Sequence, residues 1–185
     1  PFSAHAVTLG SMHDVARLSW AESGPRLAVE FLAKLGIAVV VERHLSRTHI
    51  DGAAFLLPGG QAVVALTLRH DRLDNFWYSI MHELAHLSLH LRDSSTTFLD
   101  DLDSGDDGKR VELQADELAR EALIPSDEWR QSAASRLRSP AAAIQLAEKL
   151  QINPAIVAGR VRFEHSNYRL LGHLVGAGQV RRHFV

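Results

Sequence analysis

The residues whose types and spacing best fit a chemical function are two histidines and a glutamate. They lie in the string His82-Glu83-Leu84-Ala85-His86. Residues four apart on a helix project from one face, one turn apart, so both imidazoles could reach a single metal ion. Zn²⁺ binds histidine nitrogen at about 2.0–2.1 Å, and a catalytic zinc keeps three protein ligands and a water. Glu83, rotated by about 100° around the helix, could take a proton from that water. The pattern indicates the hydrolytic chemistry of an H-E-x-x-H site, with a pair of surface histidines as the alternative.

The segment around this string has the periodicity of a helix. Apolar residues recur with a period near 3.6 over 71–91, at Leu73, Phe76 or Trp77, Ile80, Leu84, Leu87 and Leu91. Asp71 or Asp74 could serve the N-terminus of this helix. Because the apolar stripe lies opposite the histidines, we expect His82 and His86 to face away from the core that anchors the helix.

A third metal ligand must come from another part of the chain. Leu89 and Arg92 stand where the metzincin pattern requires glycine and histidine, which excludes that class. His90 continues the histidine stripe by one turn, but three residues spanning eight positions of a straight helix do not easily close on one ion. The remaining choice is a carboxylate from a second helix.

Glu112 is the strongest candidate for that carboxylate. It opens a helical pattern in which Ala115 and Ala119 lie near its face, and small residues there would let two helices approach closely. Asp116, one turn after Glu112, could accept the second ring N–H of a ligand histidine. On spacing alone the other acidic residues stay open as ligands: Glu117, Glu121 and those of the segment 92–109.

Two segments, 76–86 and 112–125, together resemble the ImmA/IrrE family of metallopeptidases. That family shows H-E-x-x-H followed by E-x-x-A-N-x-F-A-x-x-L-L-M-P. The second segment matches this pattern at Glu112, Ala115, Ala119, Leu123 and Pro125. It departs from the pattern with Asp116 for Asn, Leu118 for Phe, Ala122 for Leu and Ile124 for Met. The resemblance extends over residues 25–165.

This resemblance implies a site and a role. His82, His86 and Glu112 would bind one zinc ion per chain, and Glu83 would be the catalytic base. Family members cleave helix-turn-helix repressors of the Xre/Cro type, which relieves repression of stress, defence or mobile-element genes. The alternative is a zincin-fold transcriptional regulator or antitoxin-like protein that acts by binding DNA or a protein partner. A zinc aminopeptidase or amidase is a third hypothesis.

Residues 143–157 have the pattern of a helix-turn-helix. Three apolar residues fall where such a unit buries side chains: Ala147, Ile152 and Val157. However, Gln151 holds the turn position usually filled by glycine. The second helix offers only Arg160 and Arg162, with Asn153 at its start, for contacts to DNA. We therefore expect a packed helical hairpin here rather than direct DNA binding.

A peptidase also needs a group that stabilises the tetrahedral oxyanion. Tyr78, one turn before His82, is one candidate. His165, Tyr168 and His173 lie in the C-terminal part of the chain and could fold over the site. Structural or surface roles are the alternative for all four.

The other elements predict an α+β fold. A helical pattern covers 15–35, and strands are predicted at 37–41, 53–57 and 62–68, with a hairpin turn at 58–61. These strands would form a small antiparallel sheet. The acidic segment 92–109 is predicted to be a mobile loop rather than a calcium site, with a short edge strand near 96–99. Further helices are predicted at 126–137, 140–150, 154–164 and 168–175, before a frayed basic tail at 179–183.

Length and composition indicate one zincin-like domain over 1–185. We divide it into an N-terminal extension (1–24), a catalytic core with both zinc-binding helices (25–125) and a helical C-terminal region (126–185). The 20 Lys and Arg residues balance the 22 Asp and Glu residues, so no net field directs the protein to nucleic acid or membrane. There is no cysteine, which excludes disulfides, a cysteine nucleophile and thiolate metal ligands.

The sequence also bears on where the protein acts. No apolar run approaches the roughly 18 residues of a membrane span. The N-terminal residues 1–4 lack the basic and apolar regions of a signal peptide, so a cytoplasmic location is the default expectation. No feature of the sequence indicates an oligomeric state.

Overall fold

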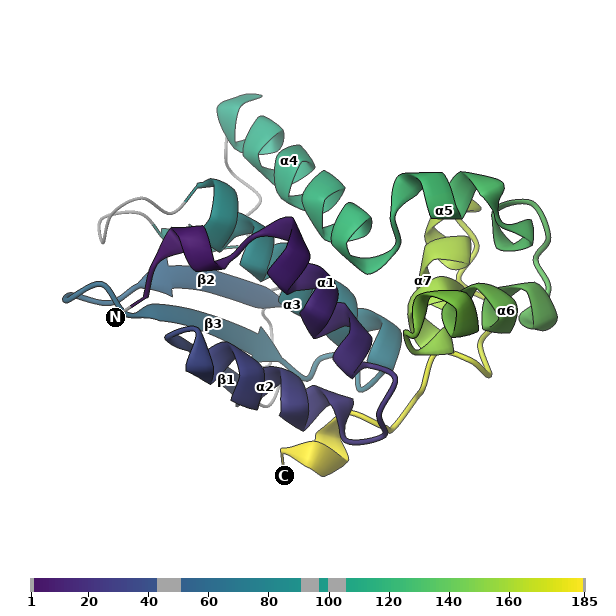
Figure 1. Ribbon diagram of the computed structural model, residues 1–185, viewed down its shortest axis with the longest axis horizontal. Helices are drawn as coiled ribbons and strands as arrows, with labels where there is room; N and C mark the ends of the chain where they lie inside the picture. Colours follow the sequence, from purple (N-terminus) through teal and green to yellow (C-terminus); the bar gives the residue numbers. More distant parts are fainter. Residues whose placement is uncertain (1, 43–50, 91–96, 100–105, 185) are drawn as a thin grey trace.

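The computed structural model describes residues 2–42, 51–90, 97–99 and 106–184. A β-sheet and the long helix α3 (Leu73–Leu89) lie together with α4 (Asp106–Leu123), while α5, α6 and α7 gather at one end (Figure 1). The remaining helices are η1 (Ala4–Ala6), α1 (Leu9–Leu18), α2 (Gly24–Lys34), α5 (Ser126–Gln131), η2 (Ala133–Ser135), α6 (Pro140–Leu150), α7 (Pro154–Glu164) and η3 (Arg181–His183). This architecture confirms the predicted α+β class.

The sheet contains β1 (Ile37–Glu42), β2 (Gly52–Leu56), β3 (Ala62–Thr67) and β4 (Thr97–Leu99), in the order β1-β3-β2-β4. β2 and β3 form the predicted antiparallel hairpin. Its turn places Gly59 and Gly60 at φ values of 102° and 83°, which only glycine adopts without strain. β4 pairs antiparallel with β2 and confirms the predicted edge strand.

The prediction of a wholly antiparallel sheet is wrong, because β1 runs parallel to β3. β1 joins the sheet beside β3 and not beside β2, its neighbour in the sequence. The apolar pattern of a strand reports which faces are buried and does not specify the partner strand, so the sequence left this order undetermined.

Helix α3 is buried along most of its length. It packs against β2, β3, α4 and α7, and Trp77, Ile80 and Met81 have no exposed surface. The histidines are enclosed as well, with exposed fractions of 7% for His82 and 2% for His86. The expectation that they face away from the core is therefore wrong, because α4 packs against α3 and its Glu112 reaches both histidines.

The first turn of α3 is completed by a distant segment. The N–H groups of Leu73 and Asp74 donate to the carbonyls of Gly176 and Val175, both at 3.3 Å. Of the two residues expected to serve this N-terminus, Asp74 lies in the first turn of the helix. Asp71 does not cap it; its Oδ1 accepts the N–H groups of Val180 and Arg181, both at 2.9 Å.

Two predictions for the C-terminal part of the chain fail for the same reason. The basic tail is not frayed: Val180 is fully buried, and residues 181–183 form the short helix η3. Residues 168–175 form successive turns instead of a helix, with Leu171 at a φ of 50°. Both segments are shaped by their contacts with the start of α3, which local sequence patterns do not report.

Near the N-terminus, the helical pattern over 15–35 corresponds to two helices, α1 and α2, and not to one. The chain turns at 19–23, where the buried Ser19 hydroxyl accepts the N–H of Asn153 at 2.8 Å. Most of the predicted acidic loop, at 92–96 and 100–105, lies outside the described residues, and Asp106 and Asp107 begin α4. None of the described helices is both long enough and apolar enough to cross a membrane.

Candidate metal centre

Close packing of α3 against α4 brings the predicted ligands together. Ala115 and Ala119 are fully buried at this interface, as expected for small residues that allow two helix backbones to approach. Glu112 lies one turn before Ala115 on the same face of α4. Its carboxylate consequently reaches the imidazole pair on α3.

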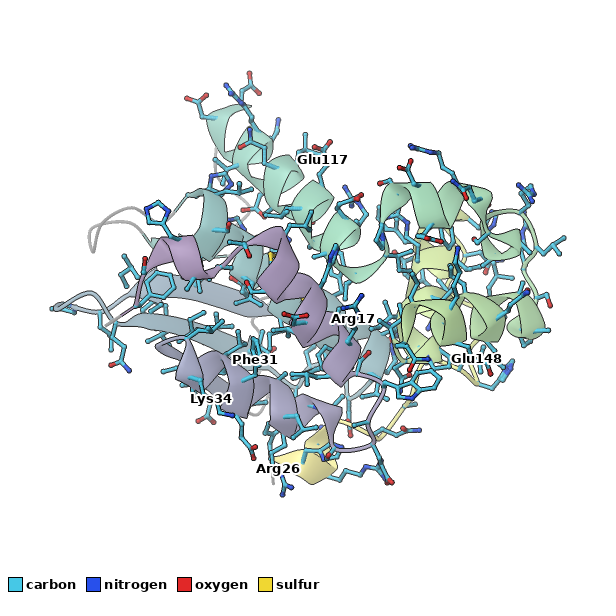
Figure 2. The ribbon with its side chains drawn as sticks, in the orientation of Figure 1. Arg17, Arg26, Phe31, Lys34, Glu117 and Glu148 are labelled. Carbon is cyan, nitrogen blue, oxygen red and sulfur yellow. The ribbon has the colours of Figure 1, made fainter. Side chains whose placement is uncertain are left out.

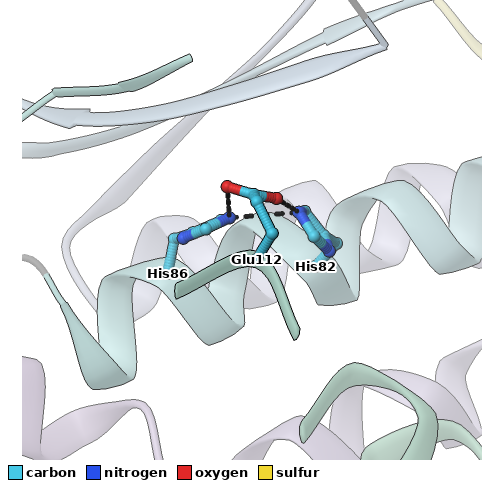
Figure 3. A group of neighbouring side chains, drawn as sticks. All are labelled: His82, His86 and Glu112. Atoms are coloured by element: carbon cyan, nitrogen blue, oxygen red, sulfur yellow. Dashed lines mark hydrogen bonds and ion pairs between the residues drawn. The ribbon is translucent and has the colours of Figure 1, made fainter. Parts of the chain in front are cut away.

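His82, His86 and Glu112 form a compact group of potential ligands (Figure 3). The two histidine Nε2 atoms are 3.0 Å apart. Glu112 Oε2 lies 3.1 Å from Nε2 of His82, and its Oε1 lies 3.4 Å from Nε2 of His86. Ligands at roughly 2.0–2.1 Å from one tetrahedral ion are separated by about 3.3–3.4 Å. The three residues therefore fit a single metal ion with one position left for water or substrate.

The other candidate ligands lie elsewhere. His90 is outside this group, and its ring hydrogen-bonds to the backbone of Val111. Glu121 Oε2 accepts the N–H of Ser126 at 3.0 Å, so it serves the start of α5. Glu117 is exposed on α4 (Figure 2). Among the described residues, Glu112 is the carboxylate that meets both histidines.

Asp116 holds His82 from the side opposite the ligand group. Its Oδ1 lies 3.0 Å from Nδ1 of His82 and also accepts a hydrogen bond from the Tyr78 hydroxyl. Burial acts to raise the pKa of Asp116, but the hydrogen bonds from His82 and Tyr78 and the charge of Arg120 lower it overall. An ionised Asp116 favours the tautomer with the proton on Nδ1, which places the lone pair of His82 on Nε2, where it can bind a metal.

His86 is held in the neutral form that metal binding requires. Burial, followed by the neighbouring His82 and His90, lowers the pKa of His86 to about 3 in the metal-free protein. A neutral imidazole presents a lone pair to a cation instead of a proton. His86 is thus prepared as a ligand at neutral pH.

Glu83 follows the candidate ligand His82 in α3 and lies against the start of β2. It lines the same cavity as His82 and Glu112. Gly52, the first residue of β2, approaches it so closely that a Cβ atom there would lie 2.9 Å from both Cγ and Cδ of Glu83. The absent side chain at residue 52 makes room for the glutamate, a feature that no motif in the sequence indicated.

A cavity of about 430 Å³ opens beside the candidate ligands. Tyr78 and Tyr168 line it, as two of the predicted oxyanion candidates. The Tyr78 hydroxyl donates a hydrogen bond to Asp116, and Tyr168 lies at the rim with 63% of its surface exposed. The other two candidates, His165 and His173, are not among its lining residues.

Three arginines line this cavity, Arg72, Arg120 and Arg160, and none of them was predicted as a site residue. Arg120 lies on the face of α4 that carries Glu112 and Asp116, at a helical spacing that could have indicated it. Arg160 comes from α7 and was considered only as a contact to DNA. No local pattern relates it to the metal ligands, because its position depends on how α7 packs against α3.

The helical hairpin of α6 and α7 packs inward. Gln151 adopts the left-handed conformation between the helices, with φ 57° and ψ 46°, in the position usually filled by glycine. Arg162 is buried, with its Nη1 3.5 Å from Asp74 Oδ2, while Arg160 lines the cavity. Of the two arginines considered for DNA contacts, Arg162 therefore lies in the interior and Arg160 lines the cavity.

The sheet, the two packed helices and the His82–His86–Glu112 group define a zincin-like metallopeptidase domain. A family model described as the IrrE N-terminal-like domain, a peptidase family, matches residues 33–162. Since this match covers more than half of the chain, the protein belongs to that family, and membership implies peptidase activity. No match was found among curated proteins.

Proposed function

We propose that this protein is a zinc-dependent endopeptidase that uses His82, His86 and Glu112 as metal ligands and Glu83 as the catalytic base. The observation that carries this proposal is the convergence of the three ligand side chains within 4.8 Å of one another. Two histidines and a glutamate form a ligand set of catalytic zinc, and the protein has no cysteine that would favour a softer site.

The residues around the ligands have separate tasks. When bound, zinc supplies a Lewis acid that polarises the scissile carbonyl and acidifies water. Glu83, on the cavity wall, accepts a proton from the attacking water and delivers it to the leaving amine nitrogen. Asp116 fixes the ring orientation of His82. Tyr78 lines the cavity, but its hydroxyl donates to Asp116, so it could stabilise an oxyanion only after releasing that hydrogen bond.

We also propose that the substrate is a helix-turn-helix repressor of the Xre/Cro type, cleaved in the cytoplasm. Cleavage would relieve repression of stress, defence or mobile-element genes. The resemblance to ImmA/IrrE proteins supports this substrate. The inward orientation of Arg160 and Arg162 supports a peptidase over the alternative of a regulator that binds DNA itself.

Metal analysis and a cleavage assay test this function together. The purified protein is expected to hold about one zinc per chain and to cut a helix-turn-helix repressor of the Xre/Cro type. Glu83→Gln should retain zinc but lose cleavage, whereas Glu117→Gln, a matched change at an exposed position of α4, should retain both. Full zinc occupancy in a His82→Ala/His86→Ala variant would contradict the metal site. Cleavage by Glu83→Gln at the wild-type rate would contradict the assigned base.

A further inference from the structure

Arg120 and Arg160 are two cations that line the same cavity from different helices. Each is held over an aromatic ring: the Arg120 guanidinium lies 5.3 Å from the centre of the Phe163 ring, and that of Arg160 lies 5.5 Å from the Trp129 ring. These contacts restrict both long side chains before any ligand arrives.

The carboxylates near Arg120 and Arg160 do not use all the hydrogen-bond donors of these two arginines. Arg120 Nη1 lies 3.4 Å from Asp116 Oδ2, but that carboxylate also serves His82 and Tyr78 through Oδ1. Arg160 Nη2 pairs with Glu164 at 2.7 Å. Its Nε and Nη1 atoms are buried and have no hydrogen-bond partner among the described residues. Buried hydrogen-bond donors without partners are unfavourable. An anion that enters the cavity could accept hydrogen bonds from these donors and remove that cost.

The two arginines also interact with each other. Burial lowers the pKa of Arg160, Glu164 opposes that effect, and the positive charge of Arg120 adds to it. Because carboxylates also line this cavity, the attraction for an anion is local to the two guanidinium groups. An anionic group placed near both would interact favourably with each of them, and guanidinium groups bind carboxylates well.

We propose that Arg120 and Arg160 form a carboxylate-binding subsite beside the metal centre, which selects peptides with an acidic group near the cleaved bond. This inference rests on the proposed peptidase function. Asp116 links the subsite to the metal ligands, because it contacts His82 on one side and Arg120 on the other.

Direct binding to the metal-free protein tests this subsite without any cleavage. The probes are fluorescein-labelled decapeptides of Ala, Ser and Leu with amidated C-termini and a single Asp at each position in turn, compared with Asn at that position. A second pair of neutral peptides ends in either a free carboxylate or an amide. Fluorescence polarisation should show about tenfold tighter binding of Asp over Asn at one or two adjacent positions.

Variants of the chain assign this preference to the two arginines. Arg120→Gln and Arg160→Gln should each reduce the Asp preference to roughly twofold or less, whereas Arg120→Lys and Arg160→Lys should retain part of it. Arg130→Gln removes an exposed charge on α5, outside the lining of this cavity, and should leave the preference unchanged. Circular dichroism and thermal unfolding confirm that each variant is folded.

The outcomes separate this inference from the proposed function. A preference for the free C-terminal carboxylate over both the amide and an internal Asp would support the subsite and assign it to the peptide terminus. Equal affinity for Asp and Asn at every position, including no measurable binding, would overturn the subsite. A preference that survives both glutamine variants would overturn it as well. Because neither metal nor catalysis enters the assay, none of these results depends on whether the protein cleaves a repressor.

Discussion

Gly52 and Glu83 are in direct contact across the interface between β2 and α3, and the absence of a side chain at Gly52 leaves the space that the glutamate occupies. A Cβ atom at residue 52 would approach within 2.9 Å of Cγ and Cδ of Glu83 and still closer to its Oε1. The neighbour that it meets is the proposed catalytic base. The first residue of a strand therefore sets the position of a residue on the metal-binding helix.

Gly52→Ala should displace the Glu83 carboxylate and lower kcat on the order of a hundredfold, because a shift of about 1 Å in a catalytic group has that effect. Zinc content should stay at the wild-type level, since the atoms nearest to the new methyl group all belong to Glu83 and not to a proposed metal ligand. Gly10→Ala is the matched control, because a Cβ on Gly10 would meet its nearest neighbour at 3.7 Å. Unchanged turnover in Gly52→Ala would show that Glu83 tolerates the displacement or is not the base.

Asp116 is predicted to strengthen metal binding through His82. Asp116→Ala removes the acceptor that lies 3.0 Å from Nδ1 of His82 and should weaken zinc affinity by about 10–100-fold. Asp116→Asn keeps an acceptor oxygen and should have a smaller effect. Competition with a chromophoric chelator measures both affinities. Equal zinc affinity in wild type and Asp116→Ala would remove Asp116 from the metal centre.

The stability of the metal-free protein should fall as the solution becomes acidic. The pKa of His86 is about 3 in the folded chain, mainly because of burial, against an ordinary value of about 6.5 after unfolding. Between these values the unfolded chain binds one more proton than the folded chain. The stabilisation is complete above pH 6.5 and is lost as the pH falls towards 3, with a slope of up to about 1.4 kcal/mol per pH unit.

Urea unfolding of the metal-free protein between pH 7 and 4 measures this slope. His86→Asn should have a shallower pH dependence than wild type, because its side chain does not titrate. His173→Asn, at an exposed position, is the control and should match wild type. Parallel curves for His86→Asn and wild type would contradict the depressed pKa.

Asp74 is expected to stabilise the junction between α3 and α7. Its side chain is 6% exposed, with Arg72 Nε at 2.8 Å and Arg162 Nη1 at 3.5 Å. Asp74→Ala leaves the buried Arg162 without this counter-charge and should lower the free energy of unfolding by about 3–5 kcal/mol. Asp127→Ala breaks an exposed pair with Arg130 and should cost less than about 1 kcal/mol. Similar thermal midpoints for the two variants would exclude this role for Asp74.

The predictable parts of this protein are those encoded by neighbouring residues. The spacing of His82 and His86 on one helix is local, and so are the glycines of the β2–β3 turn, and both were predicted. Glu112 lies 30 residues from His82, and spacing alone left other carboxylates open as ligands. The long family motif favoured Glu112 because it reports the packing of two helices, which periodicity within either helix does not.

Features that depend on tertiary packing were missed or wrong. The parallel pairing of β1 with β3 requires knowledge of strand order. The roles of Gly52 and Arg160 arise only when β2 and α7 pack against α3. The predicted frayed tail is ordered because Asp71 binds its backbone, an interaction between residues more than one hundred positions apart. In each case the determining contact is distant in sequence.

The capping of α3 by residues 175–181 has a consequence for the order in which the site can form during synthesis. The ribosome makes Asp71 and the metal-binding helix well before it makes Val180, 109 residues later. Until that segment emerges, the first turn of α3 lacks the carbonyls that its N–H groups use, and Asp71 lacks the backbone that it binds. We therefore expect the helix that carries the candidate ligands to be completed only late in translation, when a segment far from these ligands has emerged.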